Sequence, residues 1–305
     1  EVLEKDKDIA LFEEKMLGFS RLTQSKKLII QDNINFLKSN LSSRNLVKND
    51  TVNDLIVISR DTIIKEDLLI KNNQTLVINP GVNVNVEGVY LRALGGLKIL
   101  GKIDERVRVF GSESAPGTIY VSSKSDVNIE FADFVYMTNA NSSYDQPASI
   151  TFYETDSIYI SNSTFEYNVS GDDYVNFFRC QNVTVKDSYF NNVLSDAIDS
   201  DFSNLTIDNV VFENIGNDAI DGSGSNAMIV NSRFTNVKDK AVSAGENSFF
   251  EVKGSSFLDN EIALVAKDES YLLCSSNTLV RNRMDLAAFR KKRIFDYPRV
   301  TINNT

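Results

Sequence analysis

Two short acidic segments carry the side chains best suited to chemistry. Asp196, Asp199 and Asp201 belong to the first, and Asp218 and Asp221 follow at an interval of 22 in the numbering. If this interval is a structural repeat, Asp196 stacks on Asp218 in the next coil. Asp199 then stacks on Asp221, and we expect a turn between Asp196 and Asp199. Carboxylates about 5 Å apart repel each other, which raises a pKa, recruits a cation or requires a basic neighbour.

Two basic side chains lie at the same interval from these acids. Lys240 follows Asp218 by this interval, and Arg179 precedes Asp201 by it. The chain has no histidine, which removes the commonest general base. We therefore predict Lys240 and Arg179 as candidate catalytic residues, each a proton acceptor or a charge stabiliser. Asp196, Asp218 and Asp201 are the candidate substrate-binding residues.

The same acids are candidate ligands of a metal ion. Calcium binds several carboxylate and carbonyl oxygens, so Asp199 and Asp221 are the candidate calcium ligands. Asn217 and Ser243 lie nearby in the repeat. Calcium is the only cofactor that the sequence suggests. A structural interpretation stays open beside it: Asp and Asn favour bends, and the basic side chains would then only neutralise the stacked charge.

These residues belong to a stretch, residues 173–282, that repeats with a period of 22. Apolar, aromatic and polar residues each keep a column through successive units. One apolar column holds Val185, Ile207, Ile229, Val252 and Cys274, an aromatic column holds Phe190, Phe212 and Phe234, and two polar columns hold Asp187, Asn209 and Asn231, and Asn192, Asn214 and Asn236. A fixed period in the twenties indicates a solenoid whose units bury their faces against their neighbours.

Within a unit the apolar residues are two apart, as in Leu205 and Ile207, and this is the strand period. The repeat length suits three short strands and three bends, which make one coil of a parallel β-helix. A leucine-rich repeat has a similar period, but its LxxLxLxxN pattern is missing. The stretch therefore predicts an all-β parallel β-helix with polar ladders at its bends.

We expect the chain to divide into three parts. Residues 1–50 place apolar side chains at steps of three and four among Glu and Lys, which predicts an N-terminal α-helical segment. This segment is a cap for the first coil, a linker left from a preceding domain or a partner-binding arm. Residues 51–295 are the parallel β-helix, and residues 296–305 are a C-terminal tail.

The charge is divided unevenly along the chain. The net charge is −10, yet the segment from Arg281 onward carries about +5. Such an acidic body argues against nucleic-acid binding. The basic segment is interpreted as a solvated cap or as a contact with the acidic body, with a polyanion contact as the alternative. No run of about 18 apolar residues is present, so no transmembrane segment is expected.

Several segments resemble a known family. They are DAIDSDFSN from Asp196, NIGNDAIDGSGS from Asn214, DKAVSAGENS from Asp239, TLVINPG from Thr75 and AAFRKK from Ala287. They resemble the right-handed parallel β-helix repeats of bacterial envelope proteins, within the pectate-lyase-like superfamily, some of which occur alongside spore-coat-type kinase domains. The resemblance covers most of residues 60–295 and implies a right-handed coil.

The resemblance leaves the activity open, because this superfamily mixes polysaccharide lyases, epimerases, hydrolases and non-catalytic rods. Pectin hydrolases of this fold carry Gly-His-Gly and mannuronan epimerases carry Asp-Pro-His, and neither motif is possible in a chain without histidine. A calcium-dependent lyase that uses Arg or Lys as its base remains compatible.

We expect a secreted, periplasmic or cell-surface protein that binds or scaffolds an extracellular polysaccharide, or that contacts another envelope protein. Tyrosines such as Tyr153, Tyr159 and Tyr167 are candidates for stacking on sugar rings. One alternative is a calcium-assisted lyase or epimerase acting on uronate polymers. Another alternative is a structural rod or surface-appendage subunit that self-assembles through its ends. The sequence does not decide whether the protein is an enzyme.

Overall fold

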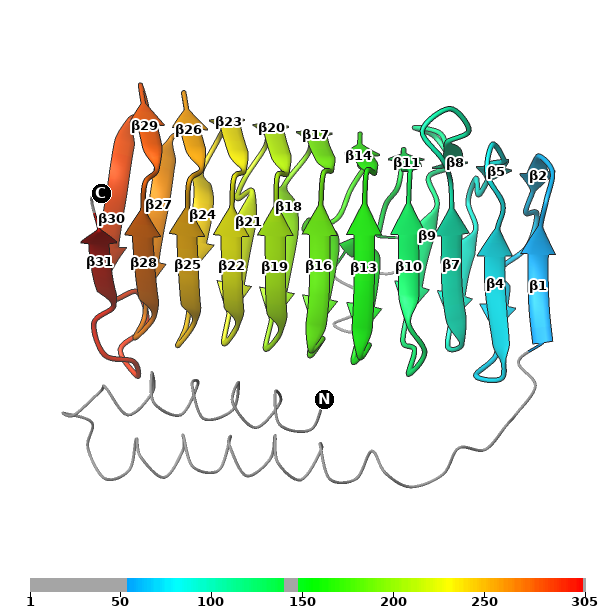
Figure 1. Cartoon of the computed structure of the whole chain (residues 1–305), viewed down its shortest axis with the longest axis horizontal. Coiled ribbons are helices and arrows are strands. Elements are labelled where there is room, and N and C mark those ends of the chain that lie inside the picture. The colour runs from blue at the N-terminus through cyan, green and yellow to red at the C-terminus, as the bar shows by residue number, and fades with distance from the viewer. Residues whose placement is uncertain (1–53, 140–147, 304–305) are drawn as a thin grey trace. The chain divides into compact units, whose positions relative to one another are not determined.

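Three parallel β-sheets wrap around one core (Figure 1). The structure is a computed structural model that describes residues 54–139 and 148–303. Sheet A contains β1 (Asp54–Ile58), β4 (Gln74–Ile78), β7 (Gly96–Leu100), β10 (Val127–Glu130), β13 (Ser157–Ser161), β16 (Asn182–Lys186), β19 (Asn204–Asp208), β22 (Asn226–Val230), β25 (Phe249–Lys253), β28 (Tyr271–Ser275) and β31 (Arg299–Asn303). Sheet B contains β2 (Thr62–Ile63), β5 (Asn83–Asn85), β8 (Val107–Phe110), β11 (Ala132–Val135), β14 (Thr164–Glu166), β17 (Tyr189–Val193), β20 (Val211–Ile215), β23 (Arg233–Val237), β26 (Ser256–Leu258) and β29 (Thr278–Val280). Sheet C contains β3 (Leu68–Ile70), β6 (Tyr90–Ala93), β9 (Thr118–Val121), β12 (Ala148–Tyr153), β15 (Asp173–Phe178), β18 (Asp196–Asp201), β21 (Ile220–Ser223), β24 (Lys240–Ala244), β27 (Ile262–Lys267) and β30 (Met284–Phe289).

Each coil contributes one strand to each sheet in turn, so the fold is a parallel β-solenoid of about 10 turns with about 23 residues per turn. In the regular coils the strands pair at the interval seen in the sequence, as Val183 does with Leu205. The pairing of Val127 with Ile158 encloses a longer stretch of chain, because more residues separate β11 from β12 in that coil than separate the same strands in the regular coils. The prediction of an all-β parallel β-helix is confirmed.

A ladder of phenylalanines runs through the core. Parallel strands in register place like residues at about 4.8 Å, which is close to the stacking distance of aromatic rings. Neighbouring centroids lie 4.5 to 5.1 Å apart along the column of Phe134, Phe165, Phe190, Phe212, Phe234 and Phe257. The three phenylalanines predicted as a column therefore belong to a longer buried stack.

The predicted polar columns lie at bends of the chain. Asp187, Asn209 and Asn231 follow the strands of sheet A with φ between 49° and 54°. Asn and Asp tolerate this left-handed conformation better than other side chains that carry a Cβ atom. The amide of Asn209 also donates a 2.7 Å hydrogen bond to Asp187 one coil earlier. Backbone conformation and pairing together explain why this column repeats.

Two parts of the predicted domain organisation lie at the chain ends. Residues 54–139 and 148–303 contain no helix, and the predicted helical segment 1–50 lies outside these described residues. In the predicted C-terminal tail, β31 pairs with β28 and extends sheet A. No helix in the described part of the chain is long and apolar enough to cross a membrane.

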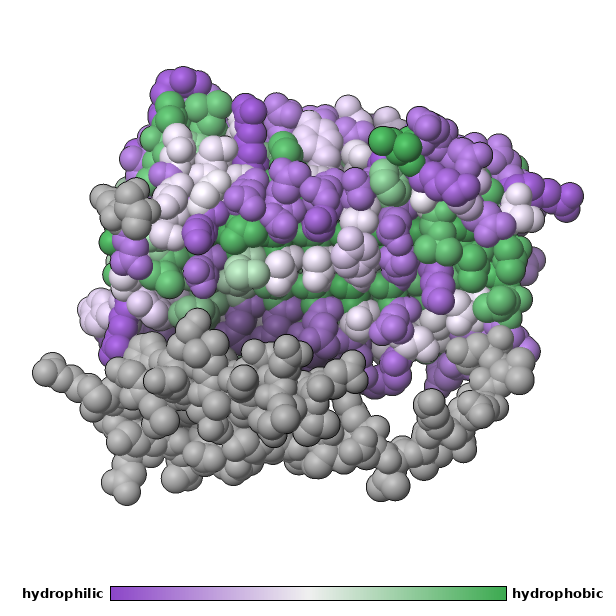
Figure 2. All heavy atoms as spheres, viewed as in Figure 1, coloured by the Kyte–Doolittle hydropathy of each residue, from purple (hydrophilic) through white to green (hydrophobic). Residues whose placement is uncertain are grey.

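Hydrophilic side chains cover most of the face that carries sheet A, with apolar ones between them (Figure 2). Exposed apolar side chains occur at both ends of the described solenoid. They include Leu55, Val57 and Ile63 in the first coil and Val280, Met284 and Phe289 in the last. Assembly through the ends remains a prediction.

Candidate functional site

A row of polar side chains crosses the outer face of sheet C. Register places Thr151, Asn176, Asp199, Asp221 and Ser243 side by side on five neighbouring strands. We call these five residues the polar row. Strand alternation turns the preceding residue of each strand into the apolar core. The polar row therefore holds five hydrogen-bonding side chains spaced by about 4.8 Å.

A second set of charges lies at the start of the same strands. Asp173 pairs with Asp196, whose Oδ1 accepts a 2.8 Å hydrogen bond from the backbone N–H of Asp218. The Oδ1 of Asp218 accepts a 2.9 Å bond from the backbone N–H of Lys240. The predicted stacks are therefore present. The predicted turn between Asp196 and Asp199 is wrong, since both lie in β18.

Two lysines compensate part of this charge. Lys240 Nζ lies 3.0 Å from Asp218 Oδ1 and also contacts Asp239. Lys267 Nζ lies 3.2 Å from Asp221 Oδ1. Burial alone would lower the pKa of Lys240, but the bonds to Asp239 and Asp218 outweigh it and raise that pKa. The raised pKa favours the ammonium form of Lys240, which stabilises negative charge.

Four carboxyls of the cluster have no cationic partner among the described residues: Asp173, Asp196, Asp199 and Asp201. Burial raises the pKa of Asp173 and of Asp199 well above the ordinary value, and neighbouring carboxylates add to the rise. Burial also raises the pKa of Asp201, although hydrogen bonds from Asn176 and Asp199 oppose this rise. A hydrogen bond between two carboxyls requires a proton on one of them.

The pKa of Asp196 is raised to about 7 by burial and by the charge of Asp218. The pKa of Asp218 is raised to about 6 by burial and by Asp221, although Lys240 acts against the rise. Near neutral pH both carboxyls therefore bind protons more readily than an exposed aspartate does.

Three atoms of the polar row are buried without a hydrogen-bond partner. They are Thr151 Oγ1, Asn176 Oδ1 and Ser243 Oγ. Their residues are at most 1% exposed. Asn176 lies within the acidic cluster, because its Nδ2 donates a 2.9 Å bond to Asp199 Oδ2. Buried polar atoms normally find a partner, so three unpaired ones in a single row are an unusual concentration.

Two aromatic rings lie next to the polar row on the same face of sheet C, in β12 and β15. Tyr153 and Phe178 lie two residues beyond Thr151 and Asn176, and so on the same face of sheet C. Their rings stack with centroids 5.2 Å apart and an interplanar angle of 4°. Register places Phe178 beside Asp201. Stacked rings and carboxyls thus adjoin one another.

Arg179 does not occupy the predicted position. Phe178, and not Arg179, pairs with Asp201. Arg179 lies at the following bend, where it contacts Glu154 at 3.2 Å and covers the ring of Phe178 at 5.2 Å. One extra residue between Phe178 and Val183 explains the shift by one position, because Phe178 pairs with Asp201 and Val183 with Leu205. Its catalytic role and that of Lys240 stay predictions, as do the substrate-binding roles of Asp196, Asp201 and Asp218.

The two predicted calcium ligands, Asp199 and Asp221, do not belong to the same group of neighbouring carboxylates. Asp196, Asp218 and Asp221 each offer an oxygen, and these oxygens lie within 4.8 Å of one another. Two of the three carboxylates already hold lysine ammonium groups. The donor types suit calcium, but the ion would have to displace these groups. Asp199 is not part of this trio.

Two residues of the site, Asp173 and Asn176, were missed because the sequence was aligned at a constant interval. That alignment matched Asp173 with Ser195, whereas the structure pairs Asp173 with Asp196 and Asn176 with Asp199, one position further along. Allowing one extra residue in this coil would have found both. Nothing in the repeat indicates the pairing of Lys267 with Asp221, because the two residues are 46 apart.

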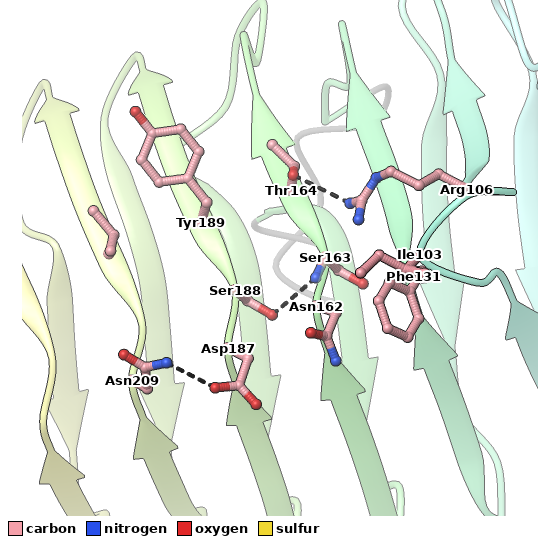
Figure 3. Close-up of a pocket in the computed structure, with 11 residues that line it drawn as sticks. Ile103, Arg106, Phe131, Asn162, Ser163, Thr164, Asp187, Ser188, Tyr189 and Asn209 are labelled. Atoms are coloured by element: carbon pink, nitrogen blue, oxygen red, sulfur yellow. Dashed lines mark hydrogen bonds between the residues drawn. The ribbon is translucent and has the colours of Figure 1, made fainter.

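A separate hollow of about 490 Å³ lies beside the bend between sheets A and B (Figure 3). Its charged groups already have partners. Asp187 accepts from Asn209 at 2.7 Å, and Arg106 Nη2 donates to Asp133 at 2.6 Å. Tyr189 donates to Glu213 at 2.6 Å. Because these groups already have hydrogen-bond partners, the hollow has fewer groups free to bind a ligand than the polar row has.

Comparison with known proteins agrees with this fold. Residues 174–304 match the family model of the right handed beta helix region. The parallel β-helix resemblance is thus confirmed at that level. No curated protein matches the chain.

Two solved structures are similar to this chain. The gp42 tailspike of Acinetobacter phage vb_AbaP_AS12 is 9% identical, with a TM-score of 0.42 over 83% of this chain. This chain spans 57% of the tailspike's length. The alginate lyase from Paenibacillus sp. str. FPU-7 is 13% identical, with a TM-score of 0.34 over 68% of this chain and 91% of the lyase.

Proposed function

We propose that this protein binds an extracellular polysaccharide, or scaffolds its handling, along the outer face of sheet C. The observation that carries the proposal is the polar row with the carboxyls beside it, of which Asp199 and Asp201 are partly exposed and have no cationic partner among the described residues. The hydroxyl groups of a polymer lying along this face would donate hydrogen bonds to these carboxyls.

The aromatic pair next to the row supports a sugar in particular. The rings of Tyr153 and Phe178 are half-buried and stacked on each other. Tyr120 stacks on the other side of Tyr153 and Arg179 lies over the ring of Phe178, so a sugar would contact the edges of these rings, which add rigid apolar surface to the hydrogen bonds. Such a role belongs in a secreted, periplasmic or cell-surface setting, where a polysaccharide or another envelope protein is the partner.

Binding of soluble oligosaccharides to the full chain, measured by calorimetry, tests the proposal. Phe178→Ala should weaken binding by about 1 kcal/mol, roughly fivefold. Tyr167→Ala is the matched control, because Tyr167 is 43% exposed and stacks on Tyr136 away from the polar row. Equal loss in both variants, or no binding by the parent chain to any oligosaccharide, would refute the site.

Calcium is a second proposed occupant, favoured by the oxygens of Asp196, Asp218 and Asp221 within 4.8 Å of one another. A bound calcium ion would neutralise a uronate polymer and would support the lyase or epimerase alternative. Calcium titration of the parent chain and of Asp221→Asn tests it. Tight binding that is lost in the variant supports a metal site, and no heat of binding in the parent removes this mechanism.

A further inference from the structure

We infer that the segment joining β30 to β31, residues 290–298, docks on an anionic lipid surface. The inference goes beyond the proposed function and does not depend on it, because it concerns the last strands of the described solenoid and not the polar row (Figure 1). Three features of the segment carry it: an anchored backbone, a cluster of exposed cations, and exposed apolar side chains among these cations.

The segment is a long connection at a bend that is short in the preceding coil. Residues 268–270 are enough to join β27 to β28, which lie in the same two sheets. The longer connection is nonetheless held in place by Asp268, which is fully buried. Its Oδ1 accepts hydrogen bonds of 2.6 and 2.7 Å from the backbone N–H groups of Lys291 and Lys292. The segment therefore presents its side chains from an anchored backbone.

The segment is strongly basic. Its charged side chains are Arg290, Lys291, Lys292, Arg293 and Asp296. Lys292 pairs with Glu246, in the bend between β24 and β25, so one lysine contacts the acidic body of the molecule. Arg290, Lys291 and Arg293 are exposed. Clustered Lys and Arg side chains bind anionic headgroups, and each one near the surface strengthens binding about fivefold.

The same segment exposes apolar side chains, and these favour a lipid surface over a soluble polyanion. Ile294 is 86% exposed, and no large apolar side chain in the described part of the chain is more exposed. Tyr297 is 69% exposed, with the guanidinium of Arg290 lying 4.8 Å from the centroid of its ring. A polyanion would leave the side chain of Ile294 in water. A bilayer would bury it at the boundary between headgroups and acyl chains, where tyrosine is also enriched.

Charge limits the contact to this part of the molecule. The whole chain carries −10, although the part from Arg281 onward carries about +5. An anionic bilayer therefore attracts the segment and repels the acidic remainder. A second exposed isoleucine lies within that remainder: Ile103 is 75% exposed, but residues 102–106 around it carry no net charge. Ile103 is thus a matched control for Ile294, with similar exposure and without the cations.

Sedimentation of the full chain with lipid vesicles is the first test. Vesicles that contain phosphatidylglycerol should bind the chain, and the affinity should fall as salt is raised, because salt screens charge. Vesicles of phosphatidylcholine alone should bind it about tenfold more weakly, or less than that. Arg293→Gln should weaken binding about fivefold, and Ile294→Asn about tenfold. Ile103→Asn should bind as the parent chain does.

A second measurement uses the absence of tryptophan from the chain. Ile294→Trp introduces a single indole ring into the segment. Its fluorescence should shift to shorter wavelength when phosphatidylglycerol vesicles are added, and lipids with brominated acyl chains should quench it. Ile103→Trp should show neither change.

Three outcomes would overturn the inference. The first is a lack of binding to phosphatidylglycerol vesicles. The second is equal binding by the parent chain, Arg293→Gln and Ile294→Asn, because another part of the chain then makes the contact. The third is a loss in Arg293→Gln but not in Ile294→Asn, with equally tight binding of soluble polyphosphate, which would favour a polyanion as the partner. None of these outcomes affects polysaccharide binding at sheet C, so the two proposals fail separately.

Discussion

Two polar stacks in this molecule follow the same sequence repeat, but their charges are compensated differently. At the bend between sheets A and B, Asp187 accepts from Asn209, and Asp208 accepts from Asn231. On sheet C, Asp199 lies between Asn176 and Asp221 and next to Asp201, with no cation of its own among the described residues. Within residues 54–139 and 148–303, the carboxylates of the bend stack have partners, whereas four carboxyls of the sheet C stack have no cationic partner.

The difference shows what repetition can and cannot indicate. A repeated Asn at a bend is explained by its backbone conformation and by its bond to the coil before it. A repeated Asp on a buried sheet face has no such explanation, since each added carboxyl raises the cost of its neighbours. Incomplete pairing, and not repetition, marks the sheet C stack as the candidate site.

The largest effect is expected where a paired charge on sheet C loses its partner. Lys240→Met removes the ammonium from Asp218, whose side chain is 3% exposed. Leaving a buried charge unpaired should destabilise the fold by about 3–5 kcal/mol at pH 8. The loss should be smaller at pH 5, because Asp218 can then take up a proton. Urea unfolding at the two pH values measures this, and equal losses would contradict it.

A smaller effect is expected at the bend. Asn209→Val forces a β-branched residue to φ 54° and removes the bond to Asp187. Backbone strain of this kind costs about 1–3 kcal/mol, and the bond adds about 1 kcal/mol. Asn209→Gly is the control that keeps the conformation and loses only the bond. If both variants unfold at the same urea concentration, the conformational explanation of this column fails.

The sequence predicted the parts of the fold that repeat. The columns of Val185 and Phe212 were predictable because core packing selects the same residue type in each coil. The site was predictable only in part. Asp196 and Asp218 were found by their interval, but one extra residue between Phe178 and Val183 shifted Asn176 out of its column. The ion pair between Lys267 and Asp221 spans two coils, so the repeat period did not indicate it.

The smallest effect expected on stability concerns a carboxyl that is uncompensated. The folded-state pKa of Asp196 is about 7, against an ordinary value of 3.8. The folded chain therefore binds more protons than the unfolded chain between these values, and stability should fall as pH rises from about 4 to about 7. Asp196→Asn removes this titration and should make the fold about 1–2 kcal/mol more stable at pH 8, with little change at pH 4. Asp187→Asn is the matched control for the loss of one carboxylate, because it removes the same charge from the bend stack. A parent chain whose stability rises through this pH range would mean that the sheet C carboxyls are compensated after all, and the contrast between the two stacks would disappear.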